Sequence, residues 1–186
     1  MSLRLTRPST SDLRALAERG ATDPLTYEPV GISAMSPPPP EFRLDRWSRT
    51  LPVGAFDRAT EAIRTWQVHR GAGIVVEAAG PPAVGSVVAM AAPLPLGYIE
   101  LVCRVVEVVD QPDRFGFTYG TLSVHAERGE ESFTVHRRPD DSITFDIVAA
   151  SRPRHVLARM FPPVARRLQL AATNRYFAAM EAAVKG

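Results

Sequence analysis

The chain has 186 residues, of which 45% are apolar and 23% charged, a composition typical of one globular domain with an additional segment. Its single cysteine, Cys103, excludes an internal disulfide and a cysteine-based metal cluster. No stretch reaches the roughly 18 consecutive apolar residues of a transmembrane helix, and Met1–Arg19 lacks the apolar core of a secretory signal, so we expect a cytoplasmic protein.

The net charge of +2 is unevenly distributed along the chain. Residues 151–186 carry seven Lys and Arg side chains and one acidic residue, a net +6, which leaves 15 basic and 19 acidic side chains, a net −4, in residues 1–150. A basic C-terminal helix is compatible with a protein partner or an anionic membrane. Arginines on the solvated face of a helix give the same pattern, so both interpretations stay open.

Residues 1–41 are predicted to be an appended segment. Ser9 and Asp12 form a capping-box pattern, which predicts a short helix over Asp12–Arg19 that ends at Gly20. Prolines prevent regular structure through most of the segment after this helix, and the run Pro37–Pro40 is typical of a stiff, extended linker. The remaining residues, 42–186, are predicted to form the main domain.

The main domain has an element order that indicates α+β architecture. A strand over Phe42–Leu51 is followed by a helix over residues 52–70, whose apolar residues recur at helical spacing. Six strand-like segments then follow one another, which predicts an antiparallel meander. Their residues are 74–79, 84–91, 98–109, 115–123, 131–137 and 143–149, with a turn expected at Arg128-Gly129.

One long helix is predicted to close the chain over residues 154–184, with a break or kink at Pro162-Pro163. Helices confined to the two flanks of a strand run indicate α+β architecture. We therefore expect a helix-grip-like fold, in which a curved sheet of about seven antiparallel strands wraps the C-terminal helix. The buried face of this helix is predicted to consist of Val164, Leu168, Ala171, Ala172, Tyr176 and Met180.

The densest polar cluster of the sequence lies between Tyr119 and Glu131. His125 beside Glu127, Glu130 and Glu131 has the composition of a carboxylate-oriented general base. Because Glu130 and Glu131 are adjacent in an extended chain, only one of the two side chains is expected to face inward. Metal ligation by the same histidine and carboxylates, and a solvated turn with no functional role, are the alternative interpretations.

Other polar residues are candidates for orienting a ligand. Tyr119 and Thr121 are two apart on a strand and are expected on the same face. Gln169, Arg175 and Tyr176 lie on the terminal helix, where an arginine or amide facing a cavity would fix a carboxylate or carbonyl group. The same residues fit a solvated strand or helix face equally well.

Several functional classes lack their motifs in this sequence. There is no phosphate-binding glycine loop, nucleophile elbow or zinc-protease motif. No fold motif or basic–aromatic surface for nucleic-acid recognition is apparent either. We expect no cofactor, no bound metal and no nucleic acid, and the sequence leaves the oligomeric state open.

The segment Gly116-Phe-Thr-Tyr-Gly-Thr-Leu122, followed by His125 and Gly129-Glu-Glu-Ser-Phe133, resembles the uncharacterised domain of unknown function 1990 family. Ser123-Val124 stands where that family more often has Pro-Gly. The resemblance extends over residues from about 24 to 180. The element order of that family is similar to the helix-grip, START-like (Bet v 1-like) folds. This resemblance implies a hydrophobic ligand between the sheet and the C-terminal helix.

These observations lead to three functional hypotheses. In the first, a small apolar ligand binds between sheet and helix and is oriented by Tyr119, Thr121, His125, Gln169, Arg175 and Tyr176. In the second, the protein is a hydrolase- or cyclase-type enzyme with His125 as general base, oriented by Glu130 or Glu131. In the third, the basic terminal helix and the proline segment dock on a protein or membrane. Whether the cavity is open or filled by Trp47 and the strand phenylalanines is not decided by the sequence.

Overall fold

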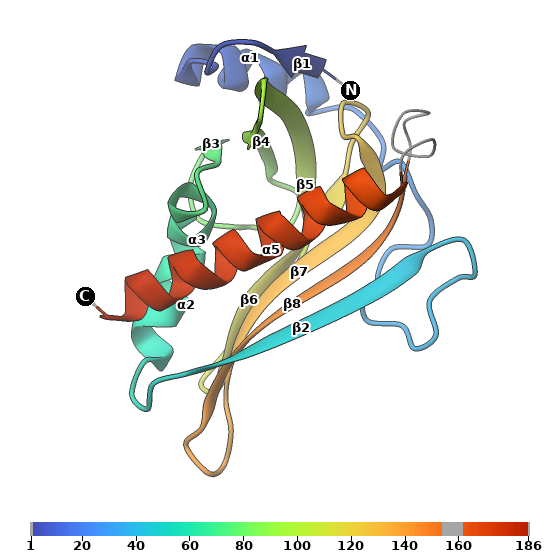
Figure 1. The fold of residues 1–186 in the computed structure, drawn as a ribbon. Helices are drawn as coiled ribbons and strands as arrows, with labels where there is room; N and C mark the ends of the chain where they lie inside the picture. The colour runs from blue at the N-terminus through green and yellow to red at the C-terminus, as the bar shows by residue number, and fades with distance from the viewer. Residues whose placement is uncertain (1, 154–161, 186) are drawn as a thin grey trace.

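The computed structural model describes residues 2–153 and 162–185, apart from the side chains at 153, 162, 164 and 165. Its dominant feature is one antiparallel sheet that curves around a long C-terminal helix (Figure 1). Within the described residues, the strand order is β2-β8-β7-β6-β5-β4-β3, and β1 pairs with β5 outside this path. The strands are β1 (Ser2–Arg4), β2 (Arg43–Leu51), β3 (Val75–Ala78), β4 (Val87–Leu94), β5 (Gly97–Gln111), β6 (Arg114–Thr121), β7 (Glu127–Arg137) and β8 (Ile143–Pro153).

The predicted meander is confirmed, since β3 to β8 each pair with the next strand in antiparallel register. β2 closes the far edge by pairing with β8 from Arg43 opposite Ser151 to Leu51 opposite Ile143. A bulge between Val105 and Glu107 interrupts the β5–β6 register, and bulges of this kind bend a strand. The α+β, helix-grip architecture expected from the element order is therefore correct.

The helix predicted as continuous over residues 52–70 is instead two helices, α2 (Phe56–Arg64) and α3 (Gln67–Gly71). Trp66 separates them in a left-handed conformation with φ of 60°. Its ring is buried 4.8 Å from the ring of Phe117, and its indole Nε1 donates to the carbonyl of Gly80 over 2.9 Å. Burial of this large side chain offsets the conformational cost, which helical periodicity alone does not reveal.

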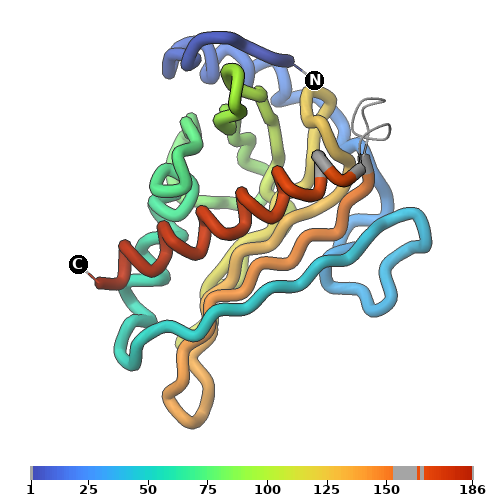
Figure 2. Tube along the Cα trace, in the orientation of Figure 1, coloured from blue at the N-terminus to red at the C-terminus, as the bar shows by residue number. Residues whose placement is uncertain are grey.

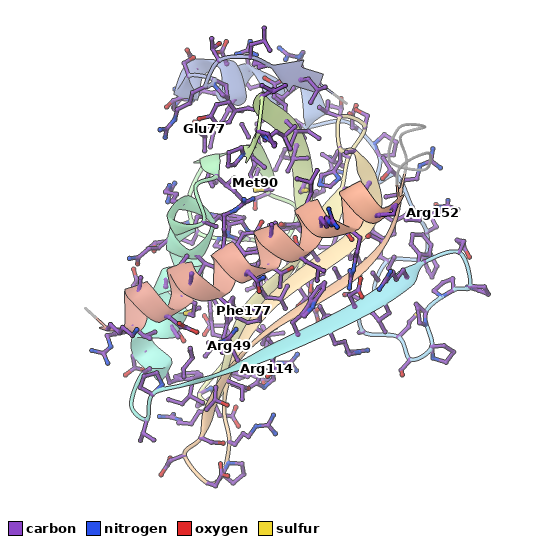
Figure 3. The ribbon with its side chains drawn as sticks, viewed as in Figure 1. Arg49, Glu77, Met90, Arg114, Arg152 and Phe177 are labelled. Atoms are coloured by element: carbon purple, nitrogen blue, oxygen red, sulfur yellow. The ribbon has the colours of Figure 1, made fainter. Side chains whose placement is uncertain are left out.

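Large apolar side chains fill one half of the space between sheet and helices. Phe117, Phe133 and Phe145 project from the inner face of the sheet and are fully buried. The C-terminal half of helix α5 (Pro162–Lys185) contributes Phe177 and Met180 to the same core. Figure 3 shows Phe177 beneath α5, near Arg49, whose guanidinium lies 5.1 Å from the Phe177 ring centre.

The terminal helix differs from its predicted form over its first turns. Residues 154–161 of the predicted helix and the side chain of Val164 lie outside the described part. Tyr176 and Met180 are buried as expected, and Ala172 is half-buried. Leu168, which is 41% exposed, and Ala171 do not belong to the buried face, so this part of the prediction is wrong. Helix α5 runs diagonally across the concave face of the sheet (Figure 2). Its buried core residues, Tyr176 to Val184, lie in its C-terminal half.

The N-terminal segment packs on the outer face of the sheet (Figure 1). Helix α1 (Thr10–Gly20) begins with the predicted capping box: the Asp12 amide donates to Ser9 Oγ over 3.1 Å, and the Ser9 amide donates to Asp12 Oδ2 over 2.9 Å. Leu13 and Leu16 of α1 form a second core with residues of β4 and β5. Gly20 lies inside the helix and not beyond its end, and a Cβ there would lie 2.9 Å from Val102. Gly20 therefore allows helix α1 to pack closely against Val102 of β5.

The turn predicted at Arg128-Gly129 is wrong, because both residues lie inside β7. The chain turns earlier, between Thr121 at the end of β6 and Glu127 at the start of β7. Gly129 has φ of 141°, and a Cβ there would lie 1.9 Å from the Ala150 carbonyl oxygen of β8. This glycine thus permits close approach of two strands, as glycines in strand interiors often do.

Within the described residues, no helix is long and apolar enough to cross a membrane.

We predict that Gly129→Ala lowers the free energy of unfolding by about 2–4 kcal/mol, because the added Cβ requires a backbone shift and a strained φ. The measurement is urea unfolding followed by circular dichroism. Gly80→Ala is the matched control, since no atom lies within 4 Å of a Cβ at that position. Equal stabilities for the two variants would contradict the role assigned to Gly129.

Candidate functional site

A cavity of ≈520 Å³ lies between the concave face of the sheet and the first half of α5. Its aliphatic wall comes from β4, β5 and α5, and the indole of Trp47 lines it from β2. Phe117, Phe133 and Phe145 belong to the neighbouring packed core and do not line the cavity. The apolar lining residues are Leu3, Trp47, Ile74, Ala92, Pro93, Leu94, Ile99, Leu101, Ala126, Ala149, Leu168 and Ala172.

A carboxyl–phenol pair lies in the wall of this cavity. Tyr119 of β6 donates its hydroxyl to Oε2 of Glu131 on β7 over 2.7 Å, across directly paired strand positions. Tyr176 of α5 brings a second phenol beside Tyr119. Burial raises the pKa of Glu131 to about 7, with Tyr119 opposing the shift and Glu127 adding to it. The pair therefore provides a carboxyl group that exchanges its proton near neutral pH.

A second carboxyl group, Glu127, lies on the same face of β7, four residues before Glu131. Gln169 of α5 donates its side-chain amide to Glu127 Oε1 over 2.6 Å. Burial raises the pKa of Glu127, and hydrogen bonds from Ser151 and Gln169 oppose that shift. Gln169, which the sequence predicted as a ligand-orienting residue, thus lines the cavity, and the Glu127 carboxyl group holds its side chain in place.

An ion pair joins the first turns of α5 to the edge strand β2. Arg166 donates from both terminal nitrogens to Asp45, over 2.7 and 3.0 Å, and its guanidinium lies 5.6 Å from the Trp47 ring centre. Such two-point arginine–carboxylate pairs fix orientation as well as distance. This pair therefore links the first turns of α5 to the edge of the sheet across the cavity.

His125 lies in the β6–β7 connection and lines the cavity. Its Nδ1 accepts a hydrogen bond from the Glu127 amide over 3.1 Å. This contact orients the ring through the backbone of its own turn. The role of His125 as a general base oriented by Glu130 or Glu131 stays a prediction.

Glu130 and Glu131 face opposite sides of β7, as the alternation of a strand requires. Glu130 is 2% exposed, and its carboxylate accepts four hydrogen bonds from the N-terminal segment. The donors are the Tyr27 hydroxyl at 2.7 Å, the Gly31 amide at 2.6 Å, and the amide and hydroxyl of Ser33 at 3.0 and 2.9 Å. Glu130 is thus the anchor of residues 27–33, and its oxygens are already occupied.

Thr121 and Arg175 also line the cavity, but their bonding differs. The Thr121 hydroxyl shares a 2.6 Å hydrogen bond with that of Thr26 and accepts from the Gly129 amide over 3.0 Å. Arg175 Nε is buried and has no hydrogen-bond partner within the described residues. Of these two predicted ligand-orienting residues, Arg175 retains an unused donor.

Trp47 was not among the sequence-based candidates for this site, and Glu127 was considered only as a carboxylate beside His125. Its place next to Glu131 in the cavity would have been predicted if β7 had been expected to begin at residue 127, because the two residues then share the Tyr119-paired face. His69, in contrast, is buried among aromatic rings with centroids 4.6 Å from Phe133 and 5.1 Å from Tyr176. Both His69 nitrogens lack partners in the described part, and burial lowers its pKa to about 3, so the ring is neutral. Among the described residues, no three His, Cys, Asp or Glu side chains are grouped so that they could hold a metal ion.

We predict that Glu130→Ala destabilises the protein by about 2–4 kcal/mol, because four donors lose a buried, charged acceptor. Thermal unfolding measured by calorimetry tests this expectation. Glu28→Ala, at an exposed position of the same anchored segment, is the control and should change stability by less than about 0.5 kcal/mol. Similar losses for both variants would show that Glu130 is not the anchor.

We further predict that Glu131→Gln removes part of the pH dependence of stability. The raised pKa of Glu131 means that the native state keeps this proton between about pH 4.5 and 7 while the unfolded state loses it. The resulting stabilisation is complete below pH 4.5 and is lost as pH rises through 7. At pH 8 the variant should therefore exceed the parent protein in stability by roughly 1–3 kcal/mol, and at pH 4 it should not. Denaturant titrations at both pH values measure this difference, and a pH-independent difference would contradict it.

The chain is similar to known proteins both in sequence and in fold. A UPF0548 protein of Deinococcus radiodurans is 38% identical over 73 residues, which cover 39% of this chain and 37% of the relative, so the match spans little more than a third of that protein. Among solved structures, Ara h 8.0201 shares the fold with a TM-score of 0.55 and 12% identity, over 78% of this chain and 99% of the other. A Thalictrum flavum norcoclaurine synthase point mutant, solved in complex with a transition state analogue, has a TM-score of 0.52 and 12% identity, over 77% and 94% of the two chains. These likenesses establish a Bet v 1-like fold.

The family follows from a separate match that spans most of the chain. The model of the family described as a domain of unknown function (DUF1990) matches residues 26–179, which include strands β2 to β8 and most of α5. The resemblance noted at Tyr119–Leu122 and Gly129–Glu131 lies within this range. The chain therefore belongs to the DUF1990 family.

Proposed function

We propose that the protein binds a small, largely apolar molecule in the cavity between the sheet and α5. The observation that carries this proposal is the cavity itself, whose ≈520 Å³ falls within the range typical of small-molecule sites. Aliphatic side chains and Trp47 form most of its wall, and a few polar groups converge on it, which is the usual composition of such sites. Burying about 200 Å² of apolar ligand surface would contribute roughly 5 kcal/mol before association costs.

The distribution of polar groups supports a ligand with one polar end. Glu131, Tyr119 and Tyr176 are grouped on β6, β7 and the facing part of α5, whereas the β4–β5 wall is aliphatic. Arg175 adds a donor without a partner in the described residues. A purely hydrocarbon ligand would leave these groups desolvated, and a polar substituent would satisfy them.

The fold comparisons support the proposal by analogy. The norcoclaurine synthase mutant was solved with a transition state analogue, so a protein of this fold accommodates a small organic molecule. For the basic-helix hypothesis we see less support, because Arg166 is already paired with Asp45. A cytoplasmic location remains our expectation for such a binding protein.

We predict that Ala172→Trp fills the cavity and weakens binding of the uncharged fluorophore N-phenylnaphthylamine at least about tenfold, because the indole occupies the ligand volume. Ala172 lines the cavity from α5, whereas Ala178 is exposed on the same helix, so Ala178→Trp is the matched control. Fluorescence titration gives both affinities, and circular dichroism verifies folding. Equal affinity of the two variants, or no binding by the parent protein, would refute the cavity as a binding site.

A further inference from the structure

Only one of the two carboxyl oxygens of Glu131 has a hydrogen-bond partner among the described residues. Oε2 accepts the Tyr119 hydroxyl, whereas Oε1 has no hydrogen-bond partner in the described part of the chain. Oε1 is also not one of the fully enclosed, unpartnered polar atoms, and Glu131 lines the cavity, so this oxygen is open to the cavity. The groups that perturb Glu131 most are Tyr119 and Glu127, neither of which is a cation. Glu131 thus presents one free oxygen to a ligand without a neutralising charge.

Arg175 is complementary to Glu131 in its chemistry. Its guanidinium is always protonated and donates only. Nε is enclosed and has no partner among the described residues, whereas the two terminal nitrogens are neither enclosed nor paired there, so they are the donors that a ligand can reach. Glu131 comes from the sheet and Arg175 from the helix above it, and both line the same cavity. A bound molecule between them therefore meets a proton acceptor from one element and a cationic donor from another.

From this juxtaposition we infer that the protein catalyses proton transfer at the carbon next to a carbonyl group of an apolar ketone held in the cavity. Arg175 would donate a hydrogen bond to the ketone oxygen, and Glu131 Oε1 would take a proton from the adjacent carbon. This inference rests on the proposed binding function and names the chemical class of its ligand.

The step balances without a further reactant. The C–H bond breaks, its proton moves to Glu131 Oε1, and its electron pair forms a carbon–carbon double bond while the carbonyl π electrons move to oxygen. The guanidinium of Arg175 stabilises the resulting enolate. Return of the proton from Glu131 to the oxygen or to a conjugated carbon completes a tautomerisation or double-bond isomerisation.

The surroundings of Glu131 favour this role. An acid whose pKa lies near neutral pH is an efficient general base. Tyr119 is a positioning residue, because its hydroxyl holds Oε2 and leaves Oε1 directed to the cavity. The titratable or charged groups that face this region are Tyr119 of β6, Glu127 of β7, Cys103 of β5, His69 of α3, His125 of the β6–β7 connection, and Arg175 and Tyr176 of α5.

Neither histidine is a better base in this arrangement. His69 does not line the cavity, and it is enclosed by aromatic rings. His125 directs Nδ1 to the amide of Glu127 in its own turn. Glu131 is therefore the better candidate base, because its Oε1 is open to the cavity and its Oε2 is held by the Tyr119 hydroxyl.

The test uses β-tetralone, an apolar ketone with acidic hydrogens, and tetralin, the matching hydrocarbon. Isothermal titration calorimetry measures binding of each to the full chain, and proton NMR in deuterium oxide measures loss of the ketone's α-hydrogen signals. We expect both to bind, β-tetralone more tightly because its carbonyl satisfies the polar groups of the cavity, and the exchange rate of β-tetralone to exceed the buffer rate at least tenfold. Glu131→Gln should reduce the protein-dependent rate about 100-fold, a typical loss for a general base, while keeping β-tetralone affinity within about threefold.

Further variants separate catalysis from structural effects. Tyr119→Phe removes a hydrogen bond that lowers the pKa of Glu131, so the acid limb of the pH–rate profile should move to higher pH. Arg175→Met should lower the rate, whereas Glu181→Gln, at an ion pair on the outer part of α5, should not. Failure of both compounds to bind overturns the binding function and this inference together. Binding of tetralin alone, or binding of both with exchange unchanged by Glu131→Gln, overturns only the proton-transfer inference.

Discussion

A single helix is too narrow to cover the sheet that it packs against, and the rest of the structure depends on this mismatch. Seven neighbouring strands at about 4.8 Å spacing give a surface roughly 30 Å wide, whereas a helix with its side chains is about 10–12 Å across. The sheet therefore curves, and α2 and α3 fill one end of the concave face with aromatic contacts. Among the described residues the other end has no equivalent filler, so an open volume remains beneath the first turns of α5.

Strand β7 joins the stability of this arrangement to its chemistry, because its alternating side chains serve opposite faces. Glu130 binds the N-terminal segment on the outer side, and Glu131 lies in the cavity wall on the inner side. Nearby, Gly129 allows β7 to approach β8 closely. The inner carboxyl group lacks the set of donors that satisfies the outer one, and this difference explains why only Glu131 is available to a ligand.

Much of the architecture was predictable because its signals are local. Alternation along residues 98–109 and 143–149 determined strand faces, and short turns determined antiparallel pairing. The break at Trp66 was not predictable, since it depends on a distant partner, Phe117, that helical periodicity does not include. Alternation also predicted that only one of Glu130 and Glu131 would face inward. Which one does so, and the unused donor of Arg175, depend on the three-dimensional register of β6, β7 and α5.

The division of the interior into a packed half and an open half also bears on how such a protein can evolve. Substitutions among Phe117, Phe133 and Phe145 alter the folding core, where each lost contact reduces stability. Substitutions at Leu94, Ile99 or Leu168, which line the cavity and lie outside the packed core, change the shape of a volume that is already unfilled, so their cost to folding is smaller. Ligand preference can therefore diverge between descendants of one ancestor while the same scaffold is inherited, because selection acts on the two halves almost independently.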